Sequence, residues 1–531
     1  MAGVYIEGGA RGRHTARFKS WIVGFVCVMG AGLAPAADVS WVGPAIGPWN
    51  NGANWSGGGV PAPDDNVTIE GALVTITDIR AIDGSFTLSG NALLQVTGAD
   101  ASFIARGATS LSDGRVAVRN GASAAFPNAT EYECTLDSNQ MLFQVDGEGS
   151  TLDLSAMESI FINGPEGAPI QQNILVGVGG VLDLSGLQWI AAADSQQLSL
   201  GAVTGGHILT PNLADVERGF ILVNDATMFD LPALTRFVNS SILVAEGGML
   251  DADNLVEAHG STFSIGGLDA ISLDRLETLV ACFFFLNNTG RVTLHALANL
   301  RDTIVQVGDG AFLDMPELVT LEATAPGALV STNGSGALSA PKLRAIRNVS
   351  FSATENSSLN LPLVETYLWD LCEGAAMFSA GTGATLNFAG LRSLTVANTG
   401  CSGLGYNVGA NGGATINLSG LRSAIVPAGH FLSFLASNPG TVIDISSLVT
   451  FNAANTTFFE LDSGRILRSG SGGGEGEGEG EGEGEGPPAG CPAPAAGARS
   501  SSAAVFGDFA LMLGLAALLG AAGRTRAKRT P

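Results

Sequence analysis

Short polar residues recur at one position of a repeated apolar phrase, and their oxygen atoms suit contacts with cations or sugars. The phrase has four apolar positions spaced L-x-L-x-x-L-x-x-L, and the polar residue lies between the first two. Because hard cations such as Ca²⁺ prefer oxygen ligands, one interpretation is a ladder of weak Ca²⁺ or glycan contacts. The interpretation that we favour is a solvated face that discourages lateral sheet pairing. The ladder consists of Asp153, Asp183, Asp230, Asp251, Asp314, Asn360, Asn387, Asn417 and Asp444.

Three tryptophans, Trp41, Trp49 and Trp55, lie close together near the start of the chain, beside Asn and Asp residues. Exposed aromatic faces in such surroundings would suit stacking on sugars. The favoured alternative is that they seal the end of a repeat array, because a terminal repeat needs a cap. The run Trp49-Asn-Asn-Gly-Ala-Asn-Trp55-Ser-Gly-Gly-Gly resembles the opening segment of secreted bacterial β-helix proteins. That resemblance implies export and a β-helix fold.

The sequence contains no motif of a common catalytic or metal site. Its histidines show no H-E-x-x-H spacing, and its cysteines match no C-x-x-C pattern. We therefore predict no catalytic residue and no cofactor except weakly bound Ca²⁺, and we leave metal binding undecided. Cys372 and Cys401 lie about one long coil apart, so a bridge between adjacent coils is conceivable, whereas Cys282 is expected in the core.

The elements that position these residues follow from the repeat. Thirteen copies of the phrase lie between Leu152 and Phe451, and from Leu213 to Leu318 successive copies are 21 residues apart. Alternation in L-x-L indicates a strand, and the small-residue corners between apolar stretches indicate tight turns. The sequence therefore predicts an all-β fold, a right-handed parallel β-solenoid (β-helix) with coils of about 21 residues. The alternative is a horseshoe like that of leucine-rich repeats, with a short helical turn opposite each strand.

Seven segments follow along the chain. They are a signal peptide at 1–37, a Trp-rich N-terminal cap segment at 38–66, irregular β-helix coils at 67–151, the repeat β-solenoid at 152–470, a flexible Gly-Glu and Pro-rich linker at 471–502, a transmembrane or sorting helix at 503–523, and a basic cytoplasmic tail at 524–531. The alternating Glu and Gly of the linker cannot form a core, which keeps it extended.

Charge limits the partners. Of the 531 residues 14% are charged, and the formal net charge is −24. Nucleic acids and anionic membrane surfaces call for a basic face, so neither is an expected partner. Removal of a leader would make the remaining chain still more acidic, because four basic residues and one acidic residue leave with it.

Both ends of the chain indicate export. Residues 1–37 combine a basic stretch, an apolar stretch and the small-residue site Ala34-Pro-Ala36, as secretory signals do. The last forty residues resemble the tripartite C-terminal sorting signals of bacterial envelope proteins, of the Myxo-type or GlyGly-type class. Gly490-Cys491-Pro492, the apolar segment and the Arg-rich end carry that resemblance, which implies that Cys491 is a processing or lipidation point. The alternative is a plain single-pass anchor with the basic tail in the cytoplasm.

These observations favour an exported cell-surface protein, held in the envelope or released after C-terminal processing. Its expected role is non-catalytic, structural or adhesive, with an extracellular glycan or matrix as partner and the membrane reached through 503–523. One alternative is a carbohydrate-active β-helix enzyme, a polysaccharide lyase or hydrolase, which would need an acid/base cluster on one strand face. Another is a passive spacer that displays the N-terminal head. Ligand identity and oligomeric state do not follow from the sequence.

Overall fold

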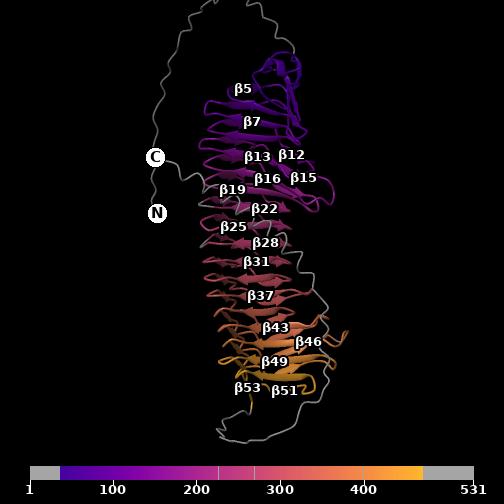
Figure 1. Ribbon diagram of the computed structural model, residues 1–531, viewed down its shortest axis with the longest axis vertical. Coiled ribbons are helices and arrows are strands. Elements are labelled where there is room, and N and C mark those ends of the chain that lie inside the picture. Colours follow the sequence, from indigo (N-terminus) through magenta and orange to yellow (C-terminus); the bar gives the residue numbers. More distant parts are fainter. Residues whose placement is uncertain (1–35, 225–226, 268–269, 399, 470–531) are drawn as a thin grey trace, which may run out of the picture. The chain divides into compact units, whose positions relative to one another are not determined.

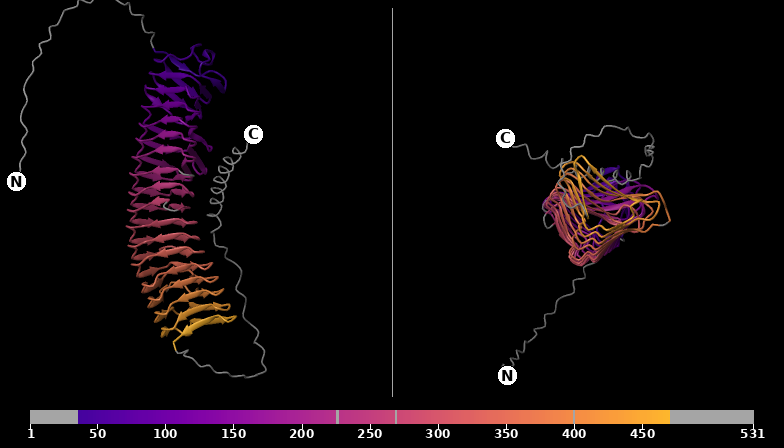
Figure 2. Two further views of the ribbon diagram at one scale, coloured as in Figure 1. Left: turned by 90° about the vertical axis from the view of Figure 1, so that its left-hand side faces the viewer. Right: turned by 90° about the horizontal axis from the view of Figure 1, so that it is seen from below.

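The chain folds into a parallel β-solenoid of about 18 turns in which six ladders of short strands form three faces (Figures 1 and 2). The computed structural model describes residues 36–224, 227–267, 270–398 and 400–469. Viewed along the stack, the three faces enclose a roughly triangular section (Figure 2). Within each ladder, neighbouring strands come from successive coils and pair in parallel, so their side chains are stacked in columns.

Face 1 is one continuous ladder of 18 strands. It comprises β2 (Ile46–Pro48), β4 (Leu73–Ile76), β7 (Leu93–Thr97), β10 (Arg115–Arg119), β13 (Met141–Asp146), β16 (Ile170–Val176), β19 (Gln196–Ala202), β22 (Gly219–Val223), β25 (Ser241–Val244), β28 (Thr262–Ile265), β31 (Phe283–Leu286), β34 (Ile304–Val307), β37 (Leu329–Thr332), β40 (Ser350–Ala353), β43 (Ala375–Ala380), β46 (Gly405–Ala410), β49 (Phe431–Ser437) and β52 (Thr456–Leu461).

Face 2 consists of a 4-stranded ladder followed by a 14-stranded one. The first comprises β1 (Asp38–Ser40), β3 (Asn66–Glu70), β6 (Phe86–Ser89) and β9 (Thr109–Ser110). The second comprises β12 (Glu131–Cys134), β15 (Ser159–Ile162), β18 (Trp189–Ala192), β21 (Asp215–Glu217), β24 (Arg236–Val238), β27 (Glu257–His259), β30 (Thr278–Val280), β33 (Asn299–Arg301), β36 (Thr320–Glu322), β39 (Ala345–Arg347), β42 (Thr366–Trp369), β45 (Ser393–Val396), β48 (Ser423–Ile425) and β51 (Thr450–Phe451).

Face 3 consists of three ladders in succession. The first comprises β5 (Ile79–Ile82), β8 (Ser102–Ala105), β11 (Ser123–Ala125), β14 (Thr151–Asp153), β17 (Val181–Asp183) and β20 (His207–Leu209). The second comprises β23 (Met228–Asp230), β26 (Met249–Asp251) and β29 (Ile271–Ser272). The third comprises β32 (Arg291–Thr293), β35 (Phe312–Asp314), β38 (Ala337–Ser339), β41 (Ser358–Asn360), β44 (Thr385–Asn387), β47 (Thr415–Asn417), β50 (Val442–Ile445) and β53 (Arg465–Arg468).

The repeated phrase describes one corner of each coil. In the second full copy Leu182 lies in β17 of face 3, a turn follows Leu184, and Ile190 lies in β18 of face 2. The four apolar side chains of this copy, which include Leu187, are at most 1% exposed. The two variable residues between the apolar positions of L-x-x-L therefore belong to a corner of the coil and not to a helical turn. The apolar residues on either side of this corner point inward from two different faces.

The predicted β-solenoid is confirmed, and the leucine-rich-repeat alternative is wrong. The one helix in the described ranges is the 3₁₀ turn η1 (Gly52–Asn54), whereas a horseshoe needs a helical turn in every repeat. The 21-residue period holds in the middle of the stack, but coils elsewhere vary. Paired residues of face 1 differ by 20 positions at Val74 and Leu94, and by 31 at Phe143 and Ile174.

Segment 38–66 is also part of the stack, because its strands β1 and β2 already pair with β3 and β4.

A column of buried polar side chains, which the apolar pattern did not reveal, lies at the corner before face 1. Its members Ser240, Ser261, Cys282 and Thr303 are 0–1% exposed. Each accepts a hydrogen bond from the amide of the equivalent residue one coil earlier, beginning with Gly219 N to Ser240 Oγ at 2.9 Å. Each also donates to backbone carbonyls, so the column satisfies polar groups that burial would otherwise leave unpaired.

Replacing the thiol in this column tests its contribution to stability. Burial raises the pKa of Cys282 to about 11, so its thiol stays protonated and donates to Val280 O at 3.2 Å. Cys282→Ala leaves the buried amide of Ser261 without its acceptor and is expected to cost about 1–3 kcal/mol in the free energy of unfolding. Cys282→Ser restores the acceptor found in neighbouring coils and should be clearly more stable than the alanine variant. Equal denaturant midpoints for the two variants would contradict the column's role.

Candidate functional site

The Asp and Asn ladder exists as a geometric feature of face 3. Asp153 lies opposite Asp183, and Asn387 lies between Asn360 and Asn417 in register. The other members, Asp230, Asp251, Asp314 and Asp444, occupy the same position of their coils. The row is interrupted, however, because Asp183 faces Leu209 in the next coil.

Six ladder residues have a local role in the turn that follows their strand. In each, the side-chain Oδ1 accepts a hydrogen bond from the backbone amide two residues later, as from Ser185 N to Asp183 at 2.9 Å. This geometry is an Asx turn, which supports a change of chain direction. The six residues are Asp153, Asp183, Asp251, Asn387, Asn417 and Asp444.

These turns give six of the nine ladder residues a local structural role that involves no cation. Among the described residues, no group of three or more His, Cys, Asp or Glu side chains is placed to hold a metal ion.

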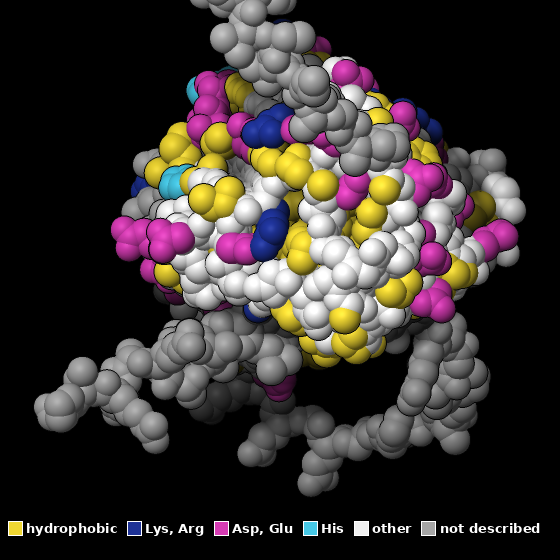
Figure 3. Space-filling model, turned by 90° about the horizontal axis from the view of Figure 1, so that it is seen from above, with side chains coloured by type: hydrophobic (Ala, Val, Ile, Leu, Met, Phe, Trp, Pro, Cys, Tyr) yellow, Lys and Arg dark blue, Asp and Glu magenta, His cyan; other side chains and the backbone are white. Residues whose placement is uncertain are grey.

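The N-terminal tryptophans form a packed cluster. Trp49 and Trp55 are each 1% exposed, their ring centroids are 4.7 Å apart, and Trp49 also contacts Phe103. Trp41 is half-buried and packs edge-on against Trp55. A buried ring cannot stack on a sugar, so the stacking alternative fails for Trp49 and Trp55, and their positions fit the capping alternative. The view onto this end of the stack shows mainly uncharged side chains over its middle and acidic ones mostly at the rim (Figure 3).

An aromatic groove lies instead on face 2, where its two ladders meet. β9 ends the first ladder and β12 begins the second, and this interruption leaves a hollow of about 440 Å³. Its lining residues are Thr109, Ser110, Ser112, Thr130, Glu131, Tyr132, Glu133, Ser159, Phe161 and Trp189. We call this hollow the face 2 groove. Its volume is within the range of sites for small ligands.

Two exposed aromatic rings form one wall of the face 2 groove. Phe161 of β15 and Trp189 of β18 are 38% and 40% exposed, and their centroids are 5.3 Å apart in an edge-to-face arrangement. They are outward-facing because Ile160 and Ile190, their neighbours along the chain, point into the core. Exposed aromatic side chains beside hydroxyl groups offer an apolar surface and hydrogen-bonding partners together.

The charge of the face 2 groove is negative. Glu131 and Glu133 lie two residues apart on β12 and are both exposed, and they are the charged members of the lining. Glu133 accepts a hydrogen bond from Asn163 Nδ2 at 3.2 Å, whereas Tyr132 between them is buried and donates to Gly114 O at 3.0 Å. Alternation along β12 therefore places these two carboxylates on the same outward face of the strand.

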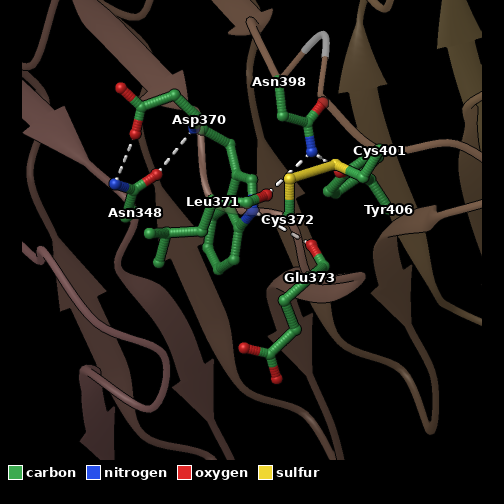
Figure 4. Close-up of a disulfide and its surroundings, with 9 residues drawn as sticks. Asn348, Asp370, Leu371, Cys372, Glu373, Asn398, Cys401 and Tyr406 are labelled. Atoms are coloured by element: carbon green, nitrogen blue, oxygen red, sulfur yellow. Dashed lines mark hydrogen bonds between the residues drawn. A yellow bond between two sulfur atoms is a disulfide. The ribbon is translucent and has the colours of Figure 1, made fainter.

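A disulfide joins Cys372 and Cys401, with their Cα atoms 5.7 Å apart, as the spacing of about one coil allowed (Figure 4). Asn398 Nδ2 donates to Leu371 O at 2.7 Å and also to the Tyr406 hydroxyl, which fixes the two loops around the bridge. Such bonds persist in oxidising compartments and are rare where thiols are kept reduced.

An ion pair beside the disulfide makes stability depend on pH. Arg347 Nη2 donates to Asp370 Oδ2 at 2.6 Å. Asn348 Nδ2 donates to Asp370 Oδ1 at 2.7 Å (Figure 4). The hydrogen bond from Arg347, helped by that from Asn348, outweighs burial and lowers the pKa of Asp370.

Asp370 therefore stabilises the folded chain fully at pH values above the pKa that its carboxyl has in the unfolded chain, about 3.9. This stabilisation is lost as the pH falls through the lower pKa that the carboxyl has in the folded chain. Asp370→Asn should remove this part of the acid dependence and cost at most about 1 kcal/mol at pH 7, measured by urea unfolding between pH 2 and 7. An unchanged acid profile in the variant would contradict this assignment.

Several predicted features lie outside the described residues. They are the signal peptide up to residue 35, the linker 471–502, the helix 503–523, the tail 524–531 and Cys491. Within the part of the chain that the structure describes, no helix is both long and apolar enough to span a membrane.

Sequence reasoning missed Phe161 and Trp189, although a signal was present. Both stand next to an inward isoleucine in the strand that closes the repeated phrase, so alternation alone predicts that they point outward. The hollow beside them was not predictable in the same way, because it depends on the interruption between β9 and β12. Comparisons with protein families, with curated proteins and with solved structures give no match for this chain.

Proposed function

We propose that this chain is an exported, non-catalytic β-solenoid of the bacterial cell envelope that contacts extracellular glycans through the face 2 groove. The observation that carries the proposal is the exposed pair of Phe161 and Trp189 beside carboxylate and hydroxyl side chains. One face of a pyranose ring presents C–H groups that pack on aromatic rings, while its hydroxyls donate to carboxylates. The disulfide between adjacent coils supports export, because an oxidising compartment maintains it.

The negative charge of the face 2 groove determines which glycans it can bind. Glu131 and Glu133 would repel uronates and sulfated sugars, and they would accept hydrogen bonds from neutral sugars or ion-pair with amino sugars. Neutral and amine-bearing polysaccharides are therefore the proposed partners. Attachment to the membrane through residues 503–523 remains part of the proposal, as does a processing role for Cys491.

Removal of the groove's aromatic rings is the direct test. Trp189→Ala and Phe161→Ala are each expected to weaken binding to a neutral polysaccharide at least 10-fold, about 1.4 kcal/mol, in affinity electrophoresis. The free energy of unfolding should change by no more than about 0.5 kcal/mol, because both rings are partly exposed. Phe459→Ala, which removes a 47% exposed ring on β52, is the matched control and should bind as the unsubstituted chain does. Equal losses in all three variants would contradict the site.

Hydrolysis is the second candidate, and the carboxylate pair is the observation that favours it. Glycoside hydrolases use two carboxyl groups that flank the scissile bond, and Glu131 and Glu133 lie on one strand face in the groove. Sugar ends released by the unsubstituted chain, and lost in both Glu131→Gln and Glu133→Gln, would replace the non-catalytic proposal with this one.

A further inference from the structure

The outward surface of face 1 is uncharged over most of its length. Twelve consecutive strands, β16 to β49, contain no Asp, Glu, Lys or Arg, and the run ends at Asp146 in β13 and Glu460 in β52. About 25% of the residues in an average globular protein are charged, and these strands hold roughly 60 residues. We call the outward-facing side of these strands the uncharged strip.

The middle of the uncharged strip carries apolar side chains in two groups. Leu222 and Leu243 stand in one outward column, and Phe283, Ile304 and Leu329 stand in the neighbouring one. All five side chains are half-buried, because stacked neighbours cover their flanks while their tips remain accessible. The outward residues of β28, Thr262 and Ser264, separate Leu222 and Leu243 from Phe283, Ile304 and Leu329, so the strip carries two apolar patches. Exposed apolar patches mark interaction sites.

The other two faces differ in charge. Face 2 carries an ion-pair ladder in which Arg236 Nη1 lies 2.9 Å from Asp215, with Glu257 in the next coil. Face 3 carries the Asp and Asn ladder. With a formal net charge of −24, two copies of this chain repel one another through most approaches. Contact between two uncharged strips brings no like charges together on the strands.

We propose that two copies of this chain pair through their uncharged strips, face to face around a two-fold axis. Twelve strands spaced about 4.8 Å apart, each about 13 Å wide, give roughly 700 Å² per copy, or about 1,400 Å² in total. That area is of the standard size for a specific interface. A two-fold arrangement is isologous, so one self-complementary surface suffices, and apolar tips of facing sheets pack about 10 Å apart.

Sedimentation equilibrium of the full chain in mild detergent, from about 0.1 to 100 µM, tests the pairing. The chain should have twice the monomer mass at the upper concentrations. Leu222→Glu/Leu243→Glu puts two carboxylates per copy into the interface and should raise the dimer dissociation constant at least 100-fold. Leu222→Ser/Leu243→Ser removes apolar area without charge and should raise it about 10-fold.

A charge-matched control keeps the result specific. Thr366→Glu/Ser423→Glu adds the same charge at outward positions of face 2 and should leave the dissociation constant unchanged. Circular dichroism of each variant should match the unsubstituted chain, which would exclude misfolding as the cause.

A monomer at every concentration overturns the proposal, as does a dimer that persists in Leu222→Glu/Leu243→Glu. If the chain is monomeric and this variant alone fails to bind an insoluble flat polysaccharide, the strip belongs to that ligand instead.

Discussion

Trp55→Ala is expected to lower the free energy of unfolding by about 4 kcal/mol, the typical cost of removing a fully buried indole. Trp55 is 1% exposed, contacts both other tryptophans of the cap, and donates from Nε1 to Trp49 O at 2.8 Å. In a repeat array each coil is stabilised by its neighbours, so losing the cap exposes the first coils to unfolding. Hydrogen exchange should accelerate first in β1 to β8.

The matched control is an indole in a different environment. Trp189 is 40% exposed, so Trp189→Ala should change stability by no more than about 0.5 kcal/mol while it weakens glycan binding. The two tryptophan variants thus separate stability from binding. A cap variant as stable as the unsubstituted chain would show that the N-terminal end needs no seal, and capping would fail as the explanation of these residues.

Loss of the disulfide is expected to have the second largest effect. Cys372 and Cys401 are separated by 29 residues, and closing a loop of that length stabilises a folded chain by about 3.5 kcal/mol in the chain-entropy account. Cys372→Ser should therefore lower stability by about that amount under oxidising conditions. Faster hydrogen exchange should be confined to the coils between β42 and β46, because repeat arrays respond locally.

Reduction provides the control for this prediction. Dithiothreitol should lower the stability of the unsubstituted chain to that of Cys372→Ser and leave the variant unchanged. Cys134 and Cys282 are free and buried, and burial raises the pKa of each to about 11, so neither reacts readily with reagents in the folded state. A variant that keeps full stability under oxidising conditions would contradict a structural role for the bridge.

The inward side chains of each coil were predictable because they obey local alternation. Leu182 and Leu184 identify a strand and its end within three residues, and the same spacing recurs through the stack. The Asx turns were also visible in principle, since Asp183 and Ser185 recur as Asp444 and Ser446 in a local pattern. What sequence could not supply was the side-by-side arrangement of coils of unequal length.

The face 2 groove shows why unequal coils matter. Ser110 and Glu131 belong to successive coils, yet β9 and β12 form no ladder with one another, and the hollow opens there. Trp189 reaches the same hollow from two coils further along the stack. The alignment of one coil on the next depends on the length of every corner. The position of a site that is assembled from several coils can therefore be read from the folded structure but not from the sequence pattern of any one coil.

The most direct test of the proposed glycan contact is incubation of the purified full chain with neutral, amine-bearing and acidic polysaccharides. Retention of the protein and release of reducing ends are measured together, with and without Ca²⁺. We expect retention on the neutral and amine-bearing polymers, reduced at least 10-fold by Trp189→Ala, with no sugar released and no effect of Ca²⁺. Released sugar ends, or retention that is indifferent to Trp189, would contradict the proposal.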